Sequence, residues 1–256
     1  MKFYEFGKEN EKTLVLLHGF ATTWEQSFRP LIDVAQNEFH IIAMAMDGFN
    51  PDEPEKDAVF VVEEARMLAD YLVEHTGGKA DIIYGASMGG MVLTDLLLDD
   101  RITVTTAIAD GYTVMQYPAW LPQGLKRRLA KMLAGMMFWL INKHKPLIAR
   151  AAGVRSLDEL DQMMYTGMTK QTMVNSEYGL MDYRYKHEAF QRADSHIWYG
   201  EKEKGVSKTV GKLKSMGIAV KDKSFPGLGH GSLLLQPERL LDEIRRAYLQ
   251  ADEEGC

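Results

Sequence analysis

Apolar residues in the first half of the chain follow two alternating patterns. Continuous apolar runs occur at Thr13–Leu17, Phe39–Met46, Asp81–Tyr84 and Thr103–Ala109. Such short runs are typical of strands buried on both faces of a sheet. Between them apolar residues recur at helical spacing, most clearly from Val59 to His75. Strands that alternate with helices predict a parallel sheet with helices on both faces.

The pattern changes in the second half of the chain. Residues 112–190 are predicted to form several methionine-rich helices and no buried strand. Strand patterns return at Ser195–Tyr199 and Ile218–Ser224, and an amphipathic helix is expected over about Pro237–Leu249. We therefore predict an α/β fold with a doubly wound, mostly parallel sheet flanked by helices and an inserted helical cap.

The length of the chain supports one domain with an insertion. At 256 residues the chain is near the size at which a single hydrophobic core stops growing. The predicted core comprises residues 1–111 and 191–256, and residues 112–190 form the predicted cap.

Composition and charge exclude several classes of protein. The hydrophobic fraction of 46% and the charged fraction of 26% are those of a folded globular protein. A net charge of −6 opposes nucleic-acid binding, which normally needs a basic surface. The single cysteine, Cys256, allows no intramolecular disulfide. We expect no signal peptide and no integral membrane segment, and these expectations together favour the cytoplasm.

The segment Gly85-Ala86-Ser87-Met88-Gly89 carries the strongest chemical signal. It matches Gly-x-Ser-x-Gly at a predicted strand-to-helix junction, where a strained turn exposes a serine hydroxyl and small neighbours let the strand and helix approach closely. The alternative is a serine in an ordinary glycine-rich turn. Ser87 is the candidate nucleophile.

Four motifs in order resemble those of the α/β-hydrolase family, in its serine esterase and lipase-like form with a helical cap. They are the strand-end loop Leu16-Leu17-His18-Gly19-Phe20, the strand end Asp47-Gly48, the segment Gly85 to Gly89, and the loop Gly229-His230-Gly231. The resemblance covers nearly the whole chain apart from the cap. It implies a mostly parallel sheet of about eight strands, with the site at their carboxyl ends.

A serine nucleophile needs a base to take its proton. The family's chain order of nucleophile, acid and histidine implies that His230 is this base. His144, His187 and His196 are more simply interpreted as solvated or locally paired side chains. His18 is expected to brace its loop rather than to transfer protons.

The acid that orients the histidine is less clearly defined by the sequence. The family has an aspartate three residues after a strand-end glycine, whereas this chain has Gly200-Glu201-Lys202-Glu203. Glu203 is therefore the candidate acid, and Asp110, at the end of the preceding strand, is the alternative. Glu201 and Glu203 could also form an ordinary charged turn.

Two backbone N–H groups should stabilise the negative charge that develops on a substrate carbonyl oxygen. Met88 directly follows the nucleophile at the start of a helix, and Phe20 directly follows His18-Gly19. We expect these two residues to form the oxyanion hole.

The predicted cap offers candidates for substrate contact. Tyr112, Trp120 and Trp139 are candidate pocket walls, and the methionines of this segment, from Met115 through Met163 to Met181, could line a pocket or simply pack helices. The basic stretch Leu125–Lys131 precedes the apolar stretch Met132–Ile141. This order is typical either of a helix that rests on an anionic membrane or of a cap helix with its apolar face turned inward.

These residues predict a serine hydrolase that cleaves a carboxylic ester, or a related small acyl substrate, through an acyl-enzyme on Ser87. The alternatives are an acyltransferase or a carbon–carbon bond hydrolase with the same triad, or a non-catalytic binding or receptor protein. The sequence has neither a metal-ligand spacing nor a phosphate-binding glycine loop, so no cofactor or metal is expected. It does not indicate an oligomeric state.

Overall fold

The computed structural model describes residues 1–113, 116–147, 156–157, 161 and 164–254, so Met115, Met163 and Cys256 lie outside the described residues. Seven described strands form one sheet in the order β1-β3-β2-β4-β5-β6-β7. Their bounds are β1 Lys2–Phe6, β2 Thr13–Leu17, β3 His40–Ala45, β4 Lys79–Ala86, β5 Thr103–Asp110, β6 Asp194–Gly200 and β7 Lys221–Phe225. Neighbouring strands from β3 to β7 are parallel, whereas β1 pairs antiparallel with β3.

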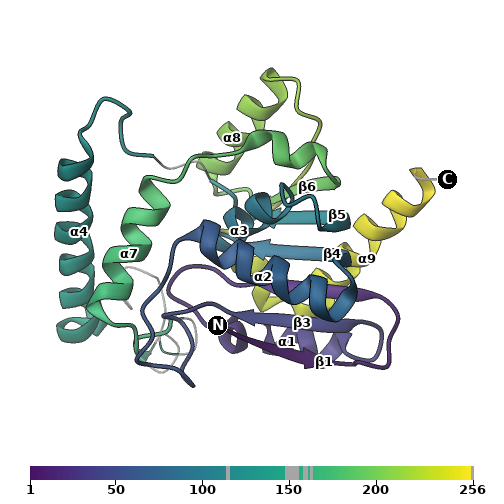
Figure 1. The fold of residues 1–256 in the computed structure, drawn as a ribbon, viewed down its shortest axis with the longest axis horizontal. Helices are drawn as coiled ribbons and strands as arrows, with labels where there is room; N and C mark the ends of the chain where they lie inside the picture. The colour runs from purple at the N-terminus through teal and green to yellow at the C-terminus, as the bar shows by residue number, and fades with distance from the viewer. Residues whose placement is uncertain (114–115, 148–155, 158–160, 162–163, 255–256) are drawn as a thin grey trace.

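Helices cover both faces of this sheet (Figure 1). One face carries α1 (Trp24–Ala35) and α9 (Pro237–Glu254), which contact each other, and the other carries α2 (Val61–Thr76), α3 (Met88–Leu96) and α8 (Lys204–Ser215). This arrangement confirms the predicted doubly wound, mostly parallel α/β fold.

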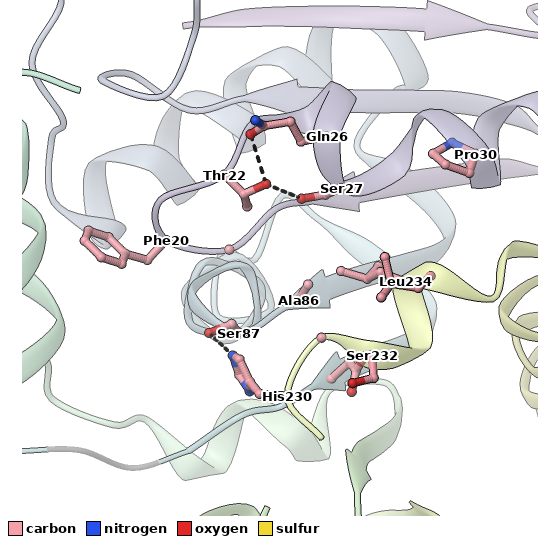
Figure 2. A pocket seen from close by; sticks show the side chains of 14 residues that line it. Phe20, Thr22, Gln26, Ser27, Pro30, Ala86, Ser87, His230, Ser232 and Leu234 are labelled. Carbon is pink, nitrogen blue, oxygen red and sulfur yellow. Dashed lines mark hydrogen bonds between the residues drawn. The ribbon is translucent and has the colours of Figure 1, made fainter. Parts of the chain in front are cut away.

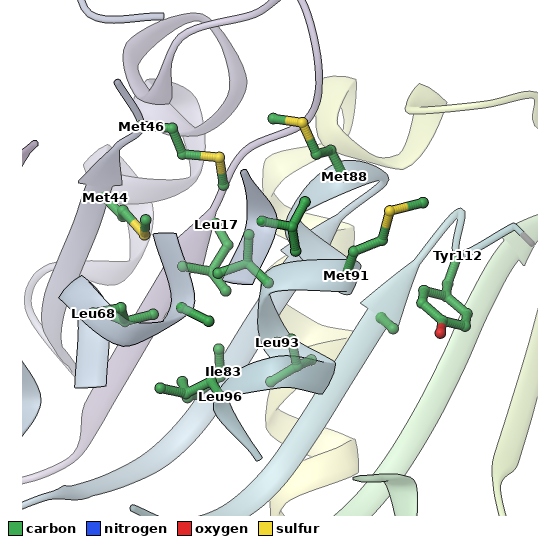
Figure 3. Packing of buried hydrophobic residues seen from close by; sticks show 14 of the residues in the cluster. Leu17, Met44, Met46, Leu68, Ile83, Met88, Met91, Leu93, Leu96 and Tyr112 are labelled. Carbon is green, nitrogen blue, oxygen red and sulfur yellow. The ribbon is translucent and has the colours of Figure 1, made fainter. Parts of the chain in front are cut away.

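The strands supply a hydrophobic core to each face because successive side chains point to opposite sides of a sheet. In β2, Val15 and Leu17 pack with α2 and α3, while Leu14 and Leu16 pack with α1 and α9. Figure 3 shows part of the cluster on the α2 and α3 side, which includes Leu17 of β2 and Met91 of α3. The continuous apolar runs in the sequence are thus strands with helices on both sides.

Between β5 and β6 the described chain forms α4 (Gln123–Lys143), α7 (Lys170–Met181) and the short 3₁₀ helix η1 (His187–Gln191). Helix α7 lies between α4 and the sheet, and α4 stands at the edge of the molecule (Figure 1). A second 3₁₀ helix, η2 (Ser232–Leu235), precedes α9. Among the described helices, none is both long and apolar enough to cross a membrane.

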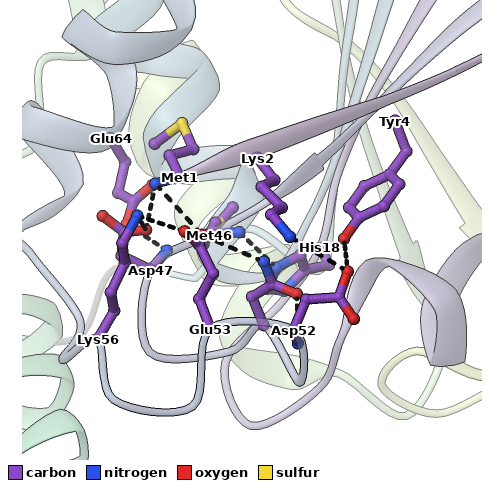
Figure 4. Close-up of polar contacts among 11 residues, drawn as sticks. Met1, Lys2, Tyr4, His18, Met46, Asp47, Asp52, Glu53, Lys56 and Glu64 are labelled. Atoms are coloured by element: carbon purple, nitrogen blue, oxygen red, sulfur yellow. Dashed lines mark hydrogen bonds and ion pairs between the residues drawn. The ribbon is translucent and has the colours of Figure 1, made fainter.

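Polar contacts tie β1 to the segment that follows β3 (Figure 4). The Tyr4 hydroxyl donates to Asp52 at 2.5 Å, and Glu64 accepts from the Asp47 N–H at 3.2 Å. Burial raises the pKa of Glu64 well above its ordinary value. The Tyr4–Asp52 contact and the ion pair between the Met1 amino group and Asp47, at 2.5 Å, hold the edge strand β1, which the apolar pattern did not predict.

Candidate active site

Ser87 occupies a sharp turn between the end of β4 and the start of α3. Its φ of +52° lies in the left-handed region, which a residue with a Cβ adopts only under strain. A Cβ added at Gly89 would lie 2.2 Å from the Leu17 carbonyl oxygen, and one added at Gly85 would lie 2.6 Å from the Gly89 backbone. The glycines are therefore required because three backbone segments meet at this turn.

His230 lies in the loop between β7 and η2, and its ring points at Ser87 (Figure 2). The Nε2 atom is 3.0 Å from the Ser87 hydroxyl oxygen, and the Nδ1 atom is 2.6 Å from Glu203 Oε1. The hydrogen bond to Glu203 raises the pKa of His230 above its ordinary value, against the opposing effect of burial. With Nδ1 donating to the carboxylate, Nε2 is free to accept the serine proton.

Glu203 is fixed by two hydrogen bonds at the carboxyl end of β6. Its Oε2 accepts from the Gly200 N–H at 2.7 Å while Oε1 contacts His230, and the side chain is mostly buried. Glu203 also precedes the first residue of α8. It is therefore held by the strand-to-helix turn and is not a solvated surface charge.

Asp110 ends the neighbouring strand β5 but makes a different contact. Its buried carboxylate accepts a hydrogen bond from the Tyr84 hydroxyl, and burial raises the pKa of Asp110 to about 6. No hydrogen bond joins the Asp110 side chain to His230 within the described part of the chain. The structure thus brings Glu203, and not Asp110, into contact with the histidine.

The two expected oxyanion-hole residues flank Ser87. A Cβ added at Gly19 would lie 3.3 Å from Ser87 Cβ, so the loop carrying Phe20 runs directly beside the serine. Met88 is the first residue of α3, where N–H groups have no partner inside the helix. Neither the Phe20 N–H nor the Met88 N–H donates to a residue that the structure describes. Both remain available to a ligand.

His18 is buried beneath this loop. Its Nε2 accepts from the Met46 N–H at 3.2 Å, and its Nδ1 donates to the Gly19 carbonyl oxygen at 2.9 Å. Burial lowers the pKa of His18 to about 4. A neutral ring therefore joins the β2 and β3 ends, as expected of a bracing residue.

Three further histidines that follow Ser87 in the chain, His144, His187 and His196, make contacts of their own. His196 pairs with Asp194 at 2.9 Å, and the His144 ring lies 4.3 Å from that of Trp139. His187 is buried and stacks on Tyr185, so of the two expected alternatives it is not solvated but has a local partner. Its position in η1, against the sheet, explains the burial.

Two cavities open on either side of Ser87 and His230. One, of about 350 Å³, extends toward α1 and η2 past Thr22, Ser27 and Leu234 (Figure 2). The other, of about 320 Å³, lies toward α7 and is lined by Met88, Met91, Gly111, Thr113 and Leu180. Thr22, Ser27 and Leu234 are not among the residues that the sequence predicted for the site, although each lies within about seven residues of a recognised motif.

The three aromatic residues expected to form pocket walls line neither cavity. Tyr112 is completely buried in the core, where its ring packs edge-on against the rings of Phe190 and Tyr185. Trp120 is 80% exposed, and Trp139 is exposed on α4, which does not reach the serine. Aromatic character alone does not distinguish a pocket wall from a core or surface position.

The described methionines of the predicted cap do not gather in one pocket. Met168 and Met173 are buried, whereas Met132 and Met136 are exposed on α4. The described residues contain no group of three or more His, Cys, Asp or Glu side chains that could hold a metal ion.

Comparison with known proteins identifies the family. The alpha/beta hydrolase family matches residues 14–243. The uncharacterized hydrolase YugF of Bacillus subtilis (strain 168) is 29% identical over 120 residues, which span 45% of this chain and 44% of YugF. The aligned region is therefore less than half of that relative.

Solved structures of low sequence identity share the fold. An alpha/beta hydrolase family protein from Desulfitobacterium hafniense has a TM-score of 0.76 at 21% identity, covering 96% of this chain and 99% of that one. A thermophilic esterase from Thermogutta terrifontis has a TM-score of 0.73 at 16% identity, covering 98% and 93%. MenH from S. aureus has a TM-score of 0.75 at 14% identity, covering 98% of each chain. With a family match over most of its length and the same fold in these structures, the chain belongs to the alpha/beta hydrolase family.

Proposed function

We propose that this protein is a serine hydrolase that cleaves carboxylic esters through an acyl-enzyme on Ser87. The observation that carries the proposal is the continuous set of hydrogen bonds from Glu203 through His230 to Ser87, at 2.6 and 3.0 Å. A strained turn at the serine and two unpartnered N–H groups beside it support the same chemistry.

The first half of the reaction forms the acyl-enzyme. His230 Nε2 takes the Ser87 proton while the hydroxyl oxygen attacks the ester carbonyl carbon. Negative charge develops on the carbonyl oxygen, where the N–H groups of Phe20 and Met88 stabilise it. Glu203 stabilises the imidazolium, which then gives its proton to the departing alcohol.

The second half returns the enzyme to its starting state. His230 Nε2 takes a proton from water, and the hydroxide oxygen attacks the acyl carbon. The carboxylic acid leaves as Ser87 regains its proton from His230. Every proton passes through one histidine nitrogen, so the fixed orientation of the ring by Glu203 matters in both halves.

The two cavities suit the two arms of an ester. An ester extends in two directions from its carbonyl carbon, and the site has space on both sides of Ser87. The apolar side chains of Met88, Met91 and Leu180 favour a hydrocarbon arm on the α7 side. We also propose that residues 112–190 act as a cap, because Leu180 of α7 contributes to this cavity.

Covalent labelling tests the proposal directly. The folded protein should react with a fluorophosphonate at Ser87, detected by peptide mass spectrometry, and Ser87→Ala should abolish the label. The protein should also release p-nitrophenol from short p-nitrophenyl esters, and Ser87→Ala should lower kcat by about a thousandfold or more.

The outcomes separate the competing functions. An unlabelled Ser87 in folded protein would contradict the hydrolase and favour a binding protein. Labelling without hydrolysis of any ester in a chain-length series would instead favour acyl transfer or carbon–carbon bond cleavage with the same residues.

A further inference from the structure

Helix α4 presents an unusual outer face at the edge of the molecule. The helix packs on α7 through a side that buries Ala130, Ala134 and Ile141. Figure 1 shows α7 between α4 and the sheet, so the opposite side of α4 faces away from the protein. The apolar side chains on that opposite side need an explanation.

Four large apolar residues form a stripe on the outer side. Leu125, Met132, Met136 and Trp139 are 43%, 62%, 53% and 53% exposed. They recur at positions i, i+7, i+11 and i+14, which lie on one face of a helix that turns by about 100° per residue. Scattered exposed apolar residues are common, but an aligned stripe of this kind marks an interaction surface. An apolar face turned inward therefore accounts for Ala130, Ala134 and Ile141 but not for this outer stripe.

Basic side chains border this stripe. Helix α4 contains five Lys or Arg residues and no Asp or Glu, in a chain whose net charge is −6. Lys126 is paired with Asp182 at 2.6 Å. Arg128, Lys131 and Lys143 are exposed and form no ion pair with a residue that the structure describes. Positive charge is thus concentrated around the exposed apolar side chains.

We propose that the outer face of α4 docks on an anionic lipid bilayer, with the helix lying in the plane of the membrane surface. Apolar side chains enter the headgroup region while Lys and Arg contact anionic headgroups. Trp139 suits this depth because its ring is apolar and its N–H is polar. The docked helix lies one helix away from the Ser87 cavity, since α7 carries Leu180.

The charges favour a bilayer over a second copy of the chain. A symmetric dimer through this face would bring the Arg128, Lys131 and Lys143 side chains of both copies together, which is repulsive. Against anionic headgroups the same residues are attractive.

Vesicle co-sedimentation tests the docking. The full chain should bind vesicles containing phosphatidylglycerol, bind pure phosphatidylcholine vesicles at least tenfold more weakly, and dissociate at high salt. Replacing Arg128, Lys131 and Lys143 with Gln should weaken binding by more than tenfold, because each basic residue near an anionic surface contributes about fivefold. Met132→Gln with Met136→Gln should weaken binding already at low salt, because it removes buried apolar contacts while every basic residue is kept.

Matched variants make the test specific. Replacing Lys79, Lys208 and Lys212, all exposed and far from α4 in sequence, with Gln removes the same charge and should leave binding unchanged. Ser87→Ala should bind vesicles normally, so docking and catalysis are tested separately. Circular dichroism checks that each variant is folded.

Three results would overturn the proposal. The folded chain could fail to bind anionic vesicles at low salt, or the α4 variants could bind as well as the control. Light scattering could also show a dimer in the absence of lipid that Met132→Gln with Met136→Gln converts to a monomer. That last result would assign the face to a second copy.

Discussion

Two carboxylates lie close to His230, and their surroundings give them different properties. Glu203 accepts from a backbone N–H at 2.7 Å and from His230 at 2.6 Å. Asp110 is buried, and its pKa is raised to about 6 although Tyr84 donates to it. Glu203 therefore contacts the histidine, while the main contact of Asp110 on β5 is with Tyr84 on the neighbouring strand β4.

Removing the charge of Glu203 should alter the pH dependence of catalysis. The hydrogen bond from Glu203 raises the pKa of His230, and the base must be neutral to accept a proton. Glu203→Gln should therefore move the acidic limb of the kcat/KM profile to lower pH. It should also lower kcat by roughly a hundredfold or more because the imidazolium loses its partner. A pH profile with a p-nitrophenyl ester measures both effects.

Asp110→Asn is the matched control for that experiment. An asparagine can still accept from the Tyr84 hydroxyl, so we expect a smaller decrease in kcat and little movement of the acidic limb. The acid assignment is wrong if Asp110→Asn produces the larger loss and Glu203→Gln leaves the profile in place.

At the scale of elements, the serine turn depends on close backbone packing. A Cβ at residue 89 would meet the Leu17 carbonyl oxygen at 2.2 Å, so β2 and α3 would have to separate. Gly89→Ala should lower the free energy of unfolding by about 3 kcal/mol, measured by urea titration. Gly211→Ala, on an exposed face of α8 with open space around its Cβ, should be neutral or stabilising by up to about 1 kcal/mol. Equal effects would argue against tight packing at the turn.

The sequence predicted the buried strands and helices better than the ends of the helices and the edge strand of the sheet. Runs such as Thr13–Leu17 are apolar on both faces because helices cover both sides, so the pattern is unambiguous. Helix α1 begins at Trp24, because Thr23 and Gln26 form a capping box that apolar spacing does not show. Strand β1 is only half buried, so it has no continuous apolar run.

The candidate site also has parts that the sequence predicts well and parts that it does not. Ser87 and its glycines follow from local backbone geometry, which a short motif records. The contact between Glu203 and His230 joins residues 27 positions apart. Asp110 ends the neighbouring strand at the same edge of the sheet, so the sequence pattern alone did not decide between the two carboxylates. Tyr112 was misjudged because its surroundings come from η1, a segment distant in sequence. Motifs therefore locate the proposed nucleophile, but the packing of distant segments decides which residues surround it.

At the scale of the whole molecule, buried and paired groups couple folding to pH. Burial lowers the pKa of His18 to about 4, so its stabilising contribution is complete above its ordinary value of 6.5 and is lost as pH falls toward 4. For Glu5, hydrogen bonds from Lys8 and His40 outweigh burial and lower the pKa to about 2. The stabilising contribution of Glu5 is complete above pH 4.5, its ordinary pKa, and is lost as pH falls toward 2. Asp110 acts in the opposite sense, because a raised carboxyl pKa adds stability as pH falls through about 6.

These opposing contributions can be separated by comparing each variant with the wild type across pH. In urea titrations, His18→Gln should remove a decline on the order of 3 kcal/mol between pH 6.5 and 4, while Glu5→Gln should remove a similar decline between pH 4.5 and 2. Gln suits position 18 because its amide can accept from the Met46 N–H and donate to the Gly19 carbonyl oxygen. Glu9→Gln, at an exposed position, is the control and should change neither window. If both variants parallel the wild type at every pH, neither His18 nor Glu5 couples folding to protonation, and the decline in acid must come from other groups.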